Sequence, residues 1–131
     1  MFKPDLSGQV AVVTGGSGVL GRAMSQALAE AGSQVAVLGR SLESATRAVQ
    51  EISEEGQELL PLACDVLDRS SLLHVRDQVR ERFGQVDILV NAAGGNRPEA
   101  STSPERSFFD LEAEAVDQVM RLNFLGTVLA C

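Results

Sequence analysis

The chain has 131 residues, of which 44% are hydrophobic and 22% are charged, which is enough for one globular domain with a buried core. Its formal net charge of −7 at pH 7 excludes a generic nucleic-acid surface, because such surfaces are basic. No apolar run is long enough to span a membrane, and no secretory signal follows the N-terminal methionine. The only cysteines are Cys64 and Cys131, so we expect neither a disulfide framework nor a metal site. These features favour a cytoplasmic protein, with Cys64 buried as a small hydrophobe.

Strands and helices are predicted to alternate along the chain. After a polar lead-in over residues 1–8, apolar runs predict strands over 10–13, 34–38, 59–63 and 87–90, and helical periodicity predicts helices over about 19–31, 41–55 and 69–83. A long irregular stretch over 95–110 precedes a last helix that begins near 111 and continues in pattern to 131. This alternation predicts an α/β fold, a doubly wound parallel (Rossmann) sheet with strand order 3-2-1-4. Residues 1–131 would form an incomplete dinucleotide-binding domain, the N-terminal half of such a fold.

The faces that the helices bury are predicted from apolar residues three and four positions apart. In the first helix these are Leu20, Ala23, Met24, Ala27, Leu28 and Ala31. In the third helix they are Leu72, Val75 and Val79, after Asp68 as N-cap. In the last helix they are Val116, Val119, Met120, Leu122 and Val128. We expect the first three helices to end at glycines, which are Gly32, Gly56 and Gly84.

The stretch over residues 9–21, QVAVVTGGSGVLG, joins the first strand to the first helix through a glycine-rich turn. Residues 16–21 fit the G-x-G-x-x-G spacing of dinucleotide-binding turns. Glycines let the backbone approach a pyrophosphate, and the N–H groups of the helix start point at its negative charge. The predicted cofactor contacts here are Gly15, Gly16, Ser17, Gly18, Val19, Leu20 and Gly21. The alternative is a tight strand–helix connection that binds no ligand.

The end of the second strand indicates which dinucleotide is bound. Arg40 and Ser41 stand there, with no acidic residue beside them. In dinucleotide folds an acid at this place bonds the ribose hydroxyls, whereas an arginine accommodates a 2′-phosphate. The sequence therefore favours NADP over NAD as cofactor, although NAD stays possible. The alternative for Arg40 is a solvated surface arginine.

The third and fourth strands also end in polar or glycine-rich residues. Ligands of open parallel sheets bind at the carboxyl ends of the strands, so these residues are further candidates for cofactor binding. They are Asp65, Val66, Asn91, Ala92, Ala93 and Gly94. Asp65 could instead be a cap that precedes a helix, and Asn91 a turn residue.

Together these residues resemble the short-chain dehydrogenase/reductase family, in its single-domain branch. Residues 14–21 resemble the family's cofactor loop, Asp65-Val66 its adenine-contacting pair, and residues 91–94 its Asn-Ala-Gly signature. Asn123 stands where the family keeps an active-site asparagine, which implies that it holds a water in a proton relay. The placing of Gly18 departs from the single-domain pattern and is typical of extended, epimerase-like members. The Asn-Ala-Ala-Gly run and Arg40 favour the single-domain branch.

The resemblance implies an oxidoreductase that uses NADP or NAD to interconvert a secondary alcohol and a ketone of a small-molecule substrate. It implies a homotetramer of the full-length protein, built on the last helix and on a neighbouring helix that is not among these residues. The GGSGVLG and NAAGGNRP motifs, the long loop and FFDL resemble D-mannonate oxidoreductases (fructuronate reductases), which implies a sugar acid such as mannonate or fructuronate. In that setting Arg97 meets a substrate carboxylate or is a solvated loop residue.

The family's Ser, Tyr and Lys have no counterpart in these residues, which include no tyrosine at all. We therefore expect the 131 residues alone to bind cofactor poorly and to turn nothing over. Two other hypotheses stay open: a non-catalytic module that senses dinucleotides, and an epimerase-like extended member of the family.

Overall fold

The computed structural model describes residues 4–131, so part of the polar lead-in predicted over 1–8 lies outside the described residues. Four parallel strands form one sheet in the order β3-β2-β1-β4, as predicted. The strands are β1 (Val10–Thr14), β2 (Gln34–Gly39), β3 (Leu59–Ala63) and β4 (Ile88–Asn91). In the central register Val12 of β1 lies between Ala36 of β2 and Leu89 of β4. The α/β fold and its strand order are thus confirmed.

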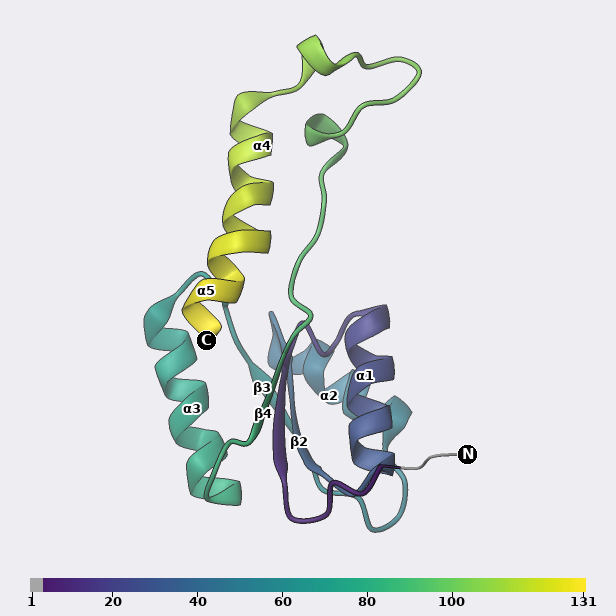
Figure 1. Ribbon diagram of the computed structural model, residues 1–131, viewed down its shortest axis with the longest axis vertical. Helices are drawn as coiled ribbons and strands as arrows, with labels where there is room; N and C mark the ends of the chain where they lie inside the picture. Colours follow the sequence, from purple (N-terminus) through teal and green to yellow (C-terminus); the bar gives the residue numbers. More distant parts are fainter. Residues whose placement is uncertain (1–3) are drawn as a thin grey trace.

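Helices cover both faces of the sheet (Figure 1). One face carries α1 (Val19–Glu30) and α2 (Leu42–Ile52), and the other carries α3 (Arg69–Phe83) and the short α5 (Gly126–Ala130). Successive strand residues point to opposite faces, so each face has its own core. Val35 and Val37 pack with α1 and α2, whereas Ala36 and Leu38 pack with α3. A sheet buried on both faces explains why its strands read as continuous apolar runs.

The third helix forms as the sequence predicts. The Asp68 side chain accepts a hydrogen bond from the backbone N–H of Ser70, and Gly84 follows the helix with a φ of 88°. Val75 and Val79 are the buried residues of this helix. An aspartate N-cap and a left-handed glycine are the usual chemistry of helix ends.

The buried face predicted for the first helix is only partly correct: Ala31 is buried and Leu28 is half-buried against the core, but the other four residues are exposed. Leu20 is 71% exposed and Met24 is also exposed, whereas Gly21, Ser25 and Ala29 are buried. At Gly21 no side chain fits because the start of α1 lies close to the turn after β1, and a Cβ there would lie 2.1 Å from the carbonyl oxygen of Gly15. Ser25 satisfies its own hydroxyl by donating to the carbonyl oxygen of Gly21 at 2.8 Å.

The second helix ends at Ile52 rather than near residue 55. Ser53 is its C-cap and has an extended backbone with a ψ of 131°. Residues 54–57 form a separate turn: the N–H of Gln57 donates to the carbonyl oxygen of Glu54 at 3.2 Å, and the amide oxygen of Gln57 accepts from the N–H of Glu54 at 3.1 Å. Gly56, with a φ of 86°, therefore belongs to this turn and does not end the helix.

The last helix departs from its prediction in start, regularity and face. It begins as α4 (Ala113–Met120), passes through a π-helical turn, η3 (Arg121–Leu125), and continues as α5. Leu122 packs against the core that α3 shares with the sheet. Val116, Met120 and Val128 are exposed instead of facing the core. The predicted face is thus correct for Leu122, and Val119 is half-buried, but it is wrong for the three exposed residues.

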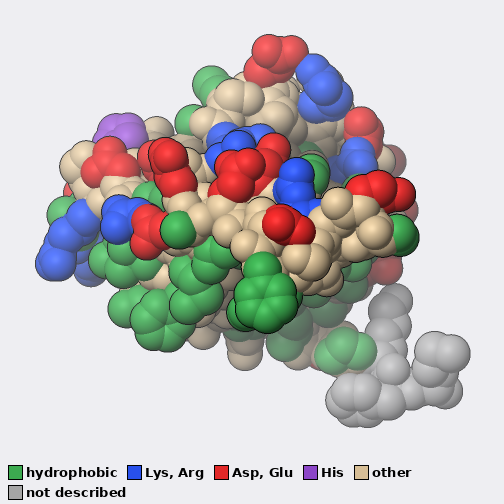
Figure 2. Space-filling view, turned by 90° about the horizontal axis from the view of Figure 1, so that it is seen from above, with side chains coloured by type: hydrophobic (Ala, Val, Ile, Leu, Met, Phe, Trp, Pro, Cys, Tyr) green, Lys and Arg blue, Asp and Glu red, His purple; other side chains and the backbone are tan. Residues whose placement is uncertain are grey.

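The stretch over residues 95–110 is irregular, as predicted, apart from two short 3₁₀ turns, η1 (Pro98–Ala100) and η2 (Phe108–Asp110). With α4 it forms an arm that extends well beyond the ends of the strands (Figure 1). Phe108 and Phe109 meet edge to face at the far end of this arm and are both exposed. Figure 2, which looks down on the arm, shows hydrophobic side chains gathered along one side of the molecule.

The two edges of the sheet differ in chemistry. Pro61 lies in the middle of β3, opposite Val37 of β2. Proline has no N–H to donate and is tolerated in edge strands for that reason. The other edge strand, β4, contains no proline. Over residues 4–131 no helix has both the length and the apolar character needed to cross a membrane.

Candidate functional site

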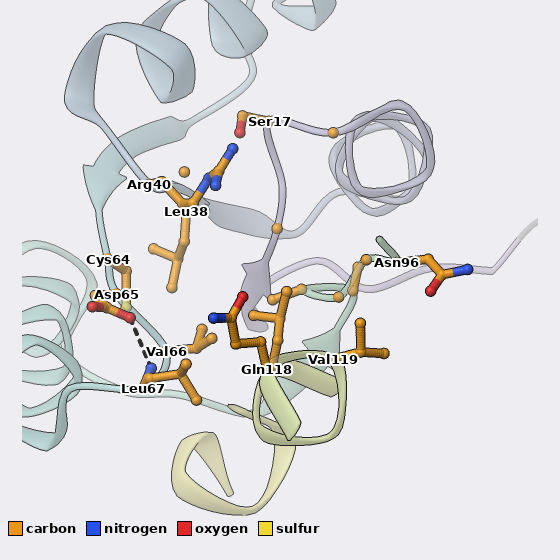
Figure 3. A pocket seen from close by; sticks show the side chains of 18 of the residues that line it. Ser17, Leu38, Arg40, Cys64, Asp65, Val66, Leu67, Asn96, Gln118 and Val119 are labelled. Atoms are coloured by element: carbon orange, nitrogen blue, oxygen red, sulfur yellow. Dashed lines mark hydrogen bonds between the residues drawn. The ribbon is translucent and has the colours of Figure 1, made fainter. Parts of the chain in front are cut away.

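A cavity of about 750 Å³ opens at the carboxyl ends of the strands, beneath α4 (Figure 3). Its walls come from the turn after β1, the end of β2, the segments that follow β3 and β4, and the inner side of α4 and η3. The predicted site residues in its lining are Gly15, Ser17, Gly18, Arg40, Asp65, Val66, Ala92, Ala93 and Gly94. The four strand exits therefore meet in one place, as parallel strand topology requires.

Seven predicted residues lie outside this lining: Gly16, Val19, Leu20, Gly21, Ser41, Asn91 and Asn123. The side chains of Val19 and Leu20 are exposed at the start of α1. Gly16 and Gly21 serve packing, because a Cβ on Gly21 would lie 2.1 Å from the carbonyl oxygen of Gly15. Ser41 is the N-cap of α2 and accepts from the N–H of Ser44 at 3.1 Å.

The glycine turn brings the exits of β1 and β4 together. Gly15 has a φ of 62°, and a Cβ there would lie 2.7 Å from the backbone of Ala92. Gly18 is the N-cap of α1 and its N–H donates to the oxygen of Gly15 at 3.0 Å. Gly18 also lines the cavity, so the positive end of the α1 dipole lies at the cavity wall. Because Gly18 has no side chain, a ligand can approach the backbone there. The arrangement suits an anionic group of a ligand.

Arg40 extends from the end of β2 and lies near Ser17 at one end of the cavity (Figure 3). No acidic side chain within residues 4–131 forms an ion pair with it. The arginine is exposed and its guanidinium is available to a ligand. A guanidinium presents a fork of donors that matches a phosphate.

Asp65 caps a turn, which is the alternative given for it from sequence, and also lines the cavity. Its Oδ1 accepts from the N–H of Leu67 at 2.9 Å, the dashed line in Figure 3, so it caps the turn that leads to α3. The same residue lines the cavity. Val66 is buried beside it and contacts the position of Gly126, where a Cβ would lie 2.9 Å from a Val66 methyl group.

Asn123 is not in the cavity wall but fixes part of it. Its Nδ2 donates to the carbonyl oxygens of Gly95 at 2.7 Å and Val119 at 2.8 Å, and its Oδ1 accepts from the N–H of Gly95 at 3.2 Å. The side chain thus links the π-helical turn to the exit of β4. Asn91 is exposed, and its Nδ2 lies 3.6 Å from the Sγ of Cys131.

Several lining residues were missed as site candidates. Gln118, Val119 and Leu122 line the cavity only because α4 folds back over the strand ends, which no local pattern reveals. Arg97 was considered as a loop arginine and also lines the cavity. Its Nε lies 3.5 Å from a carboxylate oxygen of Glu99, and its guanidinium contacts the side-chain oxygen of Gln118. A cavity-facing arginine on the long loop was therefore within reach of sequence reasoning.

Cys64 is buried at the cavity wall, as its apolar setting predicted. Burial raises the pKa of its thiol, and the carboxylates of Asp65 and Asp68 add to that rise against a hydrogen bond with Ser71. The thiol therefore stays neutral and unreactive near pH 7. No cluster of three metal-ligating side chains occurs in the part of the chain that the structure describes.

Comparison with known proteins agrees with this geometry. The family model for short chain dehydrogenases matches residues 9–131. A protein of Bacillus subtilis (strain 168) named "Uncharacterized oxidoreductase UxuB" is 42% identical over 134 residues, covering 96% of this chain and 48% of that protein. D-threitol dehydrogenase of Mycolicibacterium smegmatis is 32% identical, covering 99% of this chain and 47% of that protein.

Among solved structures, a candidate D-mannonate oxidoreductase from Haemophilus influenza, with bound NAD, superposes with a TM-score of 0.90. It is 33% identical, and the match covers 97% of this chain and 49% of that one. The chain therefore spans about half the length of the relatives that it matches.

Proposed function

The chain belongs to the short-chain dehydrogenase family of oxidoreductases, and on this premise we propose that it binds a nicotinamide dinucleotide used to interconvert a secondary alcohol and a ketone. One observation carries the proposal: a single cavity joins the bare glycine turn at the start of α1 to an unpaired arginine at the end of β2. A dinucleotide carries its phosphate charge along that path.

The residues present fit such a cofactor. Gly15 and Gly18 leave backbone where a pyrophosphate needs close approach, and the α1 N-terminus faces its charge. Asp65, Val66, Ala92, Ala93 and Gly94 line the remaining wall for the adenosine part. When bound, the nicotinamide ring of the cofactor would supply hydride chemistry, and these residues would hold the pyrophosphate and adenosine that anchor it. Asn123 contributes by fixing Gly95 beside the site.

For the cofactor, we propose NADP in preference to NAD. The support is Arg40, a cavity-lining guanidinium with no acid at position 39 or 41. The H. influenza neighbour was solved with NAD, so the preference needs a direct test. Arg40→Ala should weaken binding of NADPH by about tenfold or more and leave NADH nearly unchanged, as loss of charged hydrogen bonds predicts. Equal weakening of both cofactors would refute the role.

For the substrate, we propose a sugar acid such as mannonate or fructuronate. Arg97, at the cavity wall, is a cation that could meet the substrate carboxylate, and the candidate D-mannonate oxidoreductase is the structural precedent. The test is oxidation of NADPH by the full-length protein across a panel of ketoacids and their neutral sugar counterparts. Turnover of the neutral ketones alone would remove the sugar-acid assignment.

The same experiment separates an enzyme from a dinucleotide-sensing module, which would bind cofactor tightly and turn over nothing in the full-length protein. We also propose a cytoplasmic site of action, in keeping with two free thiols, and a homo-oligomer, in keeping with the exposed apolar side chains of α4 and α5.

A further inference from the structure

Gly39 is the last residue of β2 and directly precedes the arginine proposed to read the cofactor. Its backbone is fixed on the β3 side, where its carbonyl oxygen accepts from the N–H of Cys64 at 2.8 Å. The residue is buried and lines the cavity. This is also the end of the strand at which an acidic side chain reads the ribose hydroxyls of NAD in dinucleotide folds.

Two serine hydroxyls occupy the space that a side chain at position 39 would need. A Cβ on Gly39 would lie 2.6 Å from the Oγ of Ser44 and 2.9 Å from the Oγ of Ser17, with the backbone nitrogen of Ala45 at 3.1 Å. The two hydroxyls come from different elements, the turn after β1 and the first turn of α2. Both would have to move before position 39 could carry any side chain.

Ser44 is not free to move without loss. Its Oγ donates to the carbonyl oxygen of Ser41 at 2.9 Å and accepts from the Ser41 hydroxyl at 3.1 Å. Rotating it away from Gly39 breaks both hydrogen bonds at the N-cap of α2. Ser44 lies outside the cavity lining, so it has no direct access to a ligand there.

From this geometry we infer that Ser44, together with Ser17, determines cofactor class by keeping position 39 without a side chain. An acid at position 39 would have to displace both hydroxyls and break the Ser44 hydrogen bonds, so NAD-type ribose recognition is disfavoured and Arg40 is left to read a 2′-phosphate. The inference rests on the proposed dinucleotide binding. It makes Ser44 a positioning residue that acts through Gly39.

The test is fluorescence titration of NADH and NADPH into the purified full-length protein and its variants. Gly39→Asp alone should weaken NADPH at least tenfold without improving NADH, because the carboxylate cannot reach its ribose-binding position. Gly39→Asp with Ser44→Ala should bind NADH about tenfold or more tightly than Gly39→Asp alone, the scale of a charged hydrogen bond. Adding Ser17→Ala should extend the gain. Ser53→Ala, at the other end of α2, is the matched control and should give no rescue of Gly39→Asp.

Equal NADH affinity for Gly39→Asp with and without Ser44→Ala would overturn the inference. Wild-type protein that binds neither cofactor would instead overturn the proposed function. Thermal unfolding is a second measurement, which tests the steric part of the inference even if no cofactor binds or Gly39→Asp does not fold. Gly39→Ala should lower Tm by about 4 °C or more, and by clearly less in a Ser44→Ala background. An unchanged drop in that background would overturn the steric claim itself.

Discussion

The side-chain amide of Asn123 pairs with both backbone groups of Gly95, donating to its oxygen at 2.7 Å and accepting from its N–H at 3.2 Å. The two residues are 28 positions apart in sequence, and the pairing has the form of a strand-to-strand bridge. It holds the exit of β4 against the π-helical turn. Gly94 must be small here, because a Cβ on it would lie 2.6 Å from the Asn123 Oδ1.

Asn123→Ala should therefore lower the free energy of unfolding by about 1–2 kcal/mol, the net value of the hydrogen bonds lost. Asn123→Asp keeps the acceptor for Gly95 and loses the two donated bonds, so it should fall near Asn123→Ala. Urea unfolding measures both. Asn91→Ala, which removes an exposed amide with one weak contact to sulfur, is the control and should cost markedly less. Similar costs at both positions would contradict the linking role of Asn123.

Two glycines of the cofactor turn should separate folding from ligand binding. A Cβ on Gly21 would lie 2.1 Å from the backbone oxygen of Gly15, whereas a Cβ on Gly18 would lie 3.3 Å from the same atom. Gly21→Ala should cost at least about 2 kcal/mol, since a backbone atom cannot rotate out of the way. Gly18→Ala should leave stability nearly intact and still weaken NADPH binding, because its methyl group enters the cavity wall.

Thermal unfolding and cofactor titration, run on both variants, check this separation. A Gly18→Ala protein with unchanged NADPH affinity would show that the pyrophosphate does not approach the turn. A stable Gly21→Ala protein would show that α1 can move away from the turn at little cost.

The apolar face of α4 and η3 should govern self-association. Met120 is 60% exposed and Phe124 is 67% exposed, so the fold does not depend on them. Replacing both with Gln should change the free energy of unfolding by no more than about 0.5 kcal/mol, as for other surface positions. The same double variant should shift an oligomer toward monomer in size-exclusion chromatography with light scattering. An unaltered oligomer, or a wild-type protein that is monomeric at high concentration, would contradict this role for the face.

Stability should fall in acid partly through the cap of α3. Hydrogen bonds from the Ser70 hydroxyl and backbone N–H hold the pKa of Asp68 below its ordinary value. The unfolded state then binds more protons, so this contribution is present above the unfolded pKa, near 4, and is lost as pH falls through the lower folded value. Asp68→Asn keeps a good N-cap without a titrating group.

Urea unfolding at pH 7 and pH 3 should show a smaller acid-induced loss of stability for Asp68→Asn than for wild type. Asp77→Asn, which removes a carboxylate from the middle of the same helix, is the matched comparison for the change of charge. Identical pH dependence for all three proteins would remove Asp68 from the acid response.

The features that follow from strand topology were predicted correctly from the sequence. Apolar runs and right-handed crossovers gave the strand order, and that order alone brings Gly15, Arg40, Asp65 and Ala92 to one cavity. The prediction of buried residues failed where the distance between packed elements determines which side chains fit. Periodicity selected Leu20 and Met24 for burial in α1, but both are exposed, because the start of the helix lies close to the turn after β1 and buries Gly21 instead. The buried row of Gly, Ser and Ala has almost no hydrophobic signal.

The remaining errors have a similar origin in tertiary structure. No particular residue type marks the π-helical turn, so the 3.6-residue spacing of apolar residues does not predict it. Gln118 enters the cavity only because α4 folds back over the strand ends. At position 39 the glycine itself can be read from the sequence. The two serine hydroxyls that occupy the space of a side chain there come from two other segments, so the sequence alone does not explain the glycine.

Pro61 in β3 determines at which edge of the sheet a further strand can pair. At Pro61 the outer edge lacks an N–H that an added strand would need, so further pairing on that side is interrupted in the middle of the strand. Beside β4 the backbone groups of Ile88–Asn91 are regular and carry no such block. Any strand that extends this sheet, whether from the same polypeptide, from an exchanged segment or in an aggregate, should therefore join beside β4, next to the cavity.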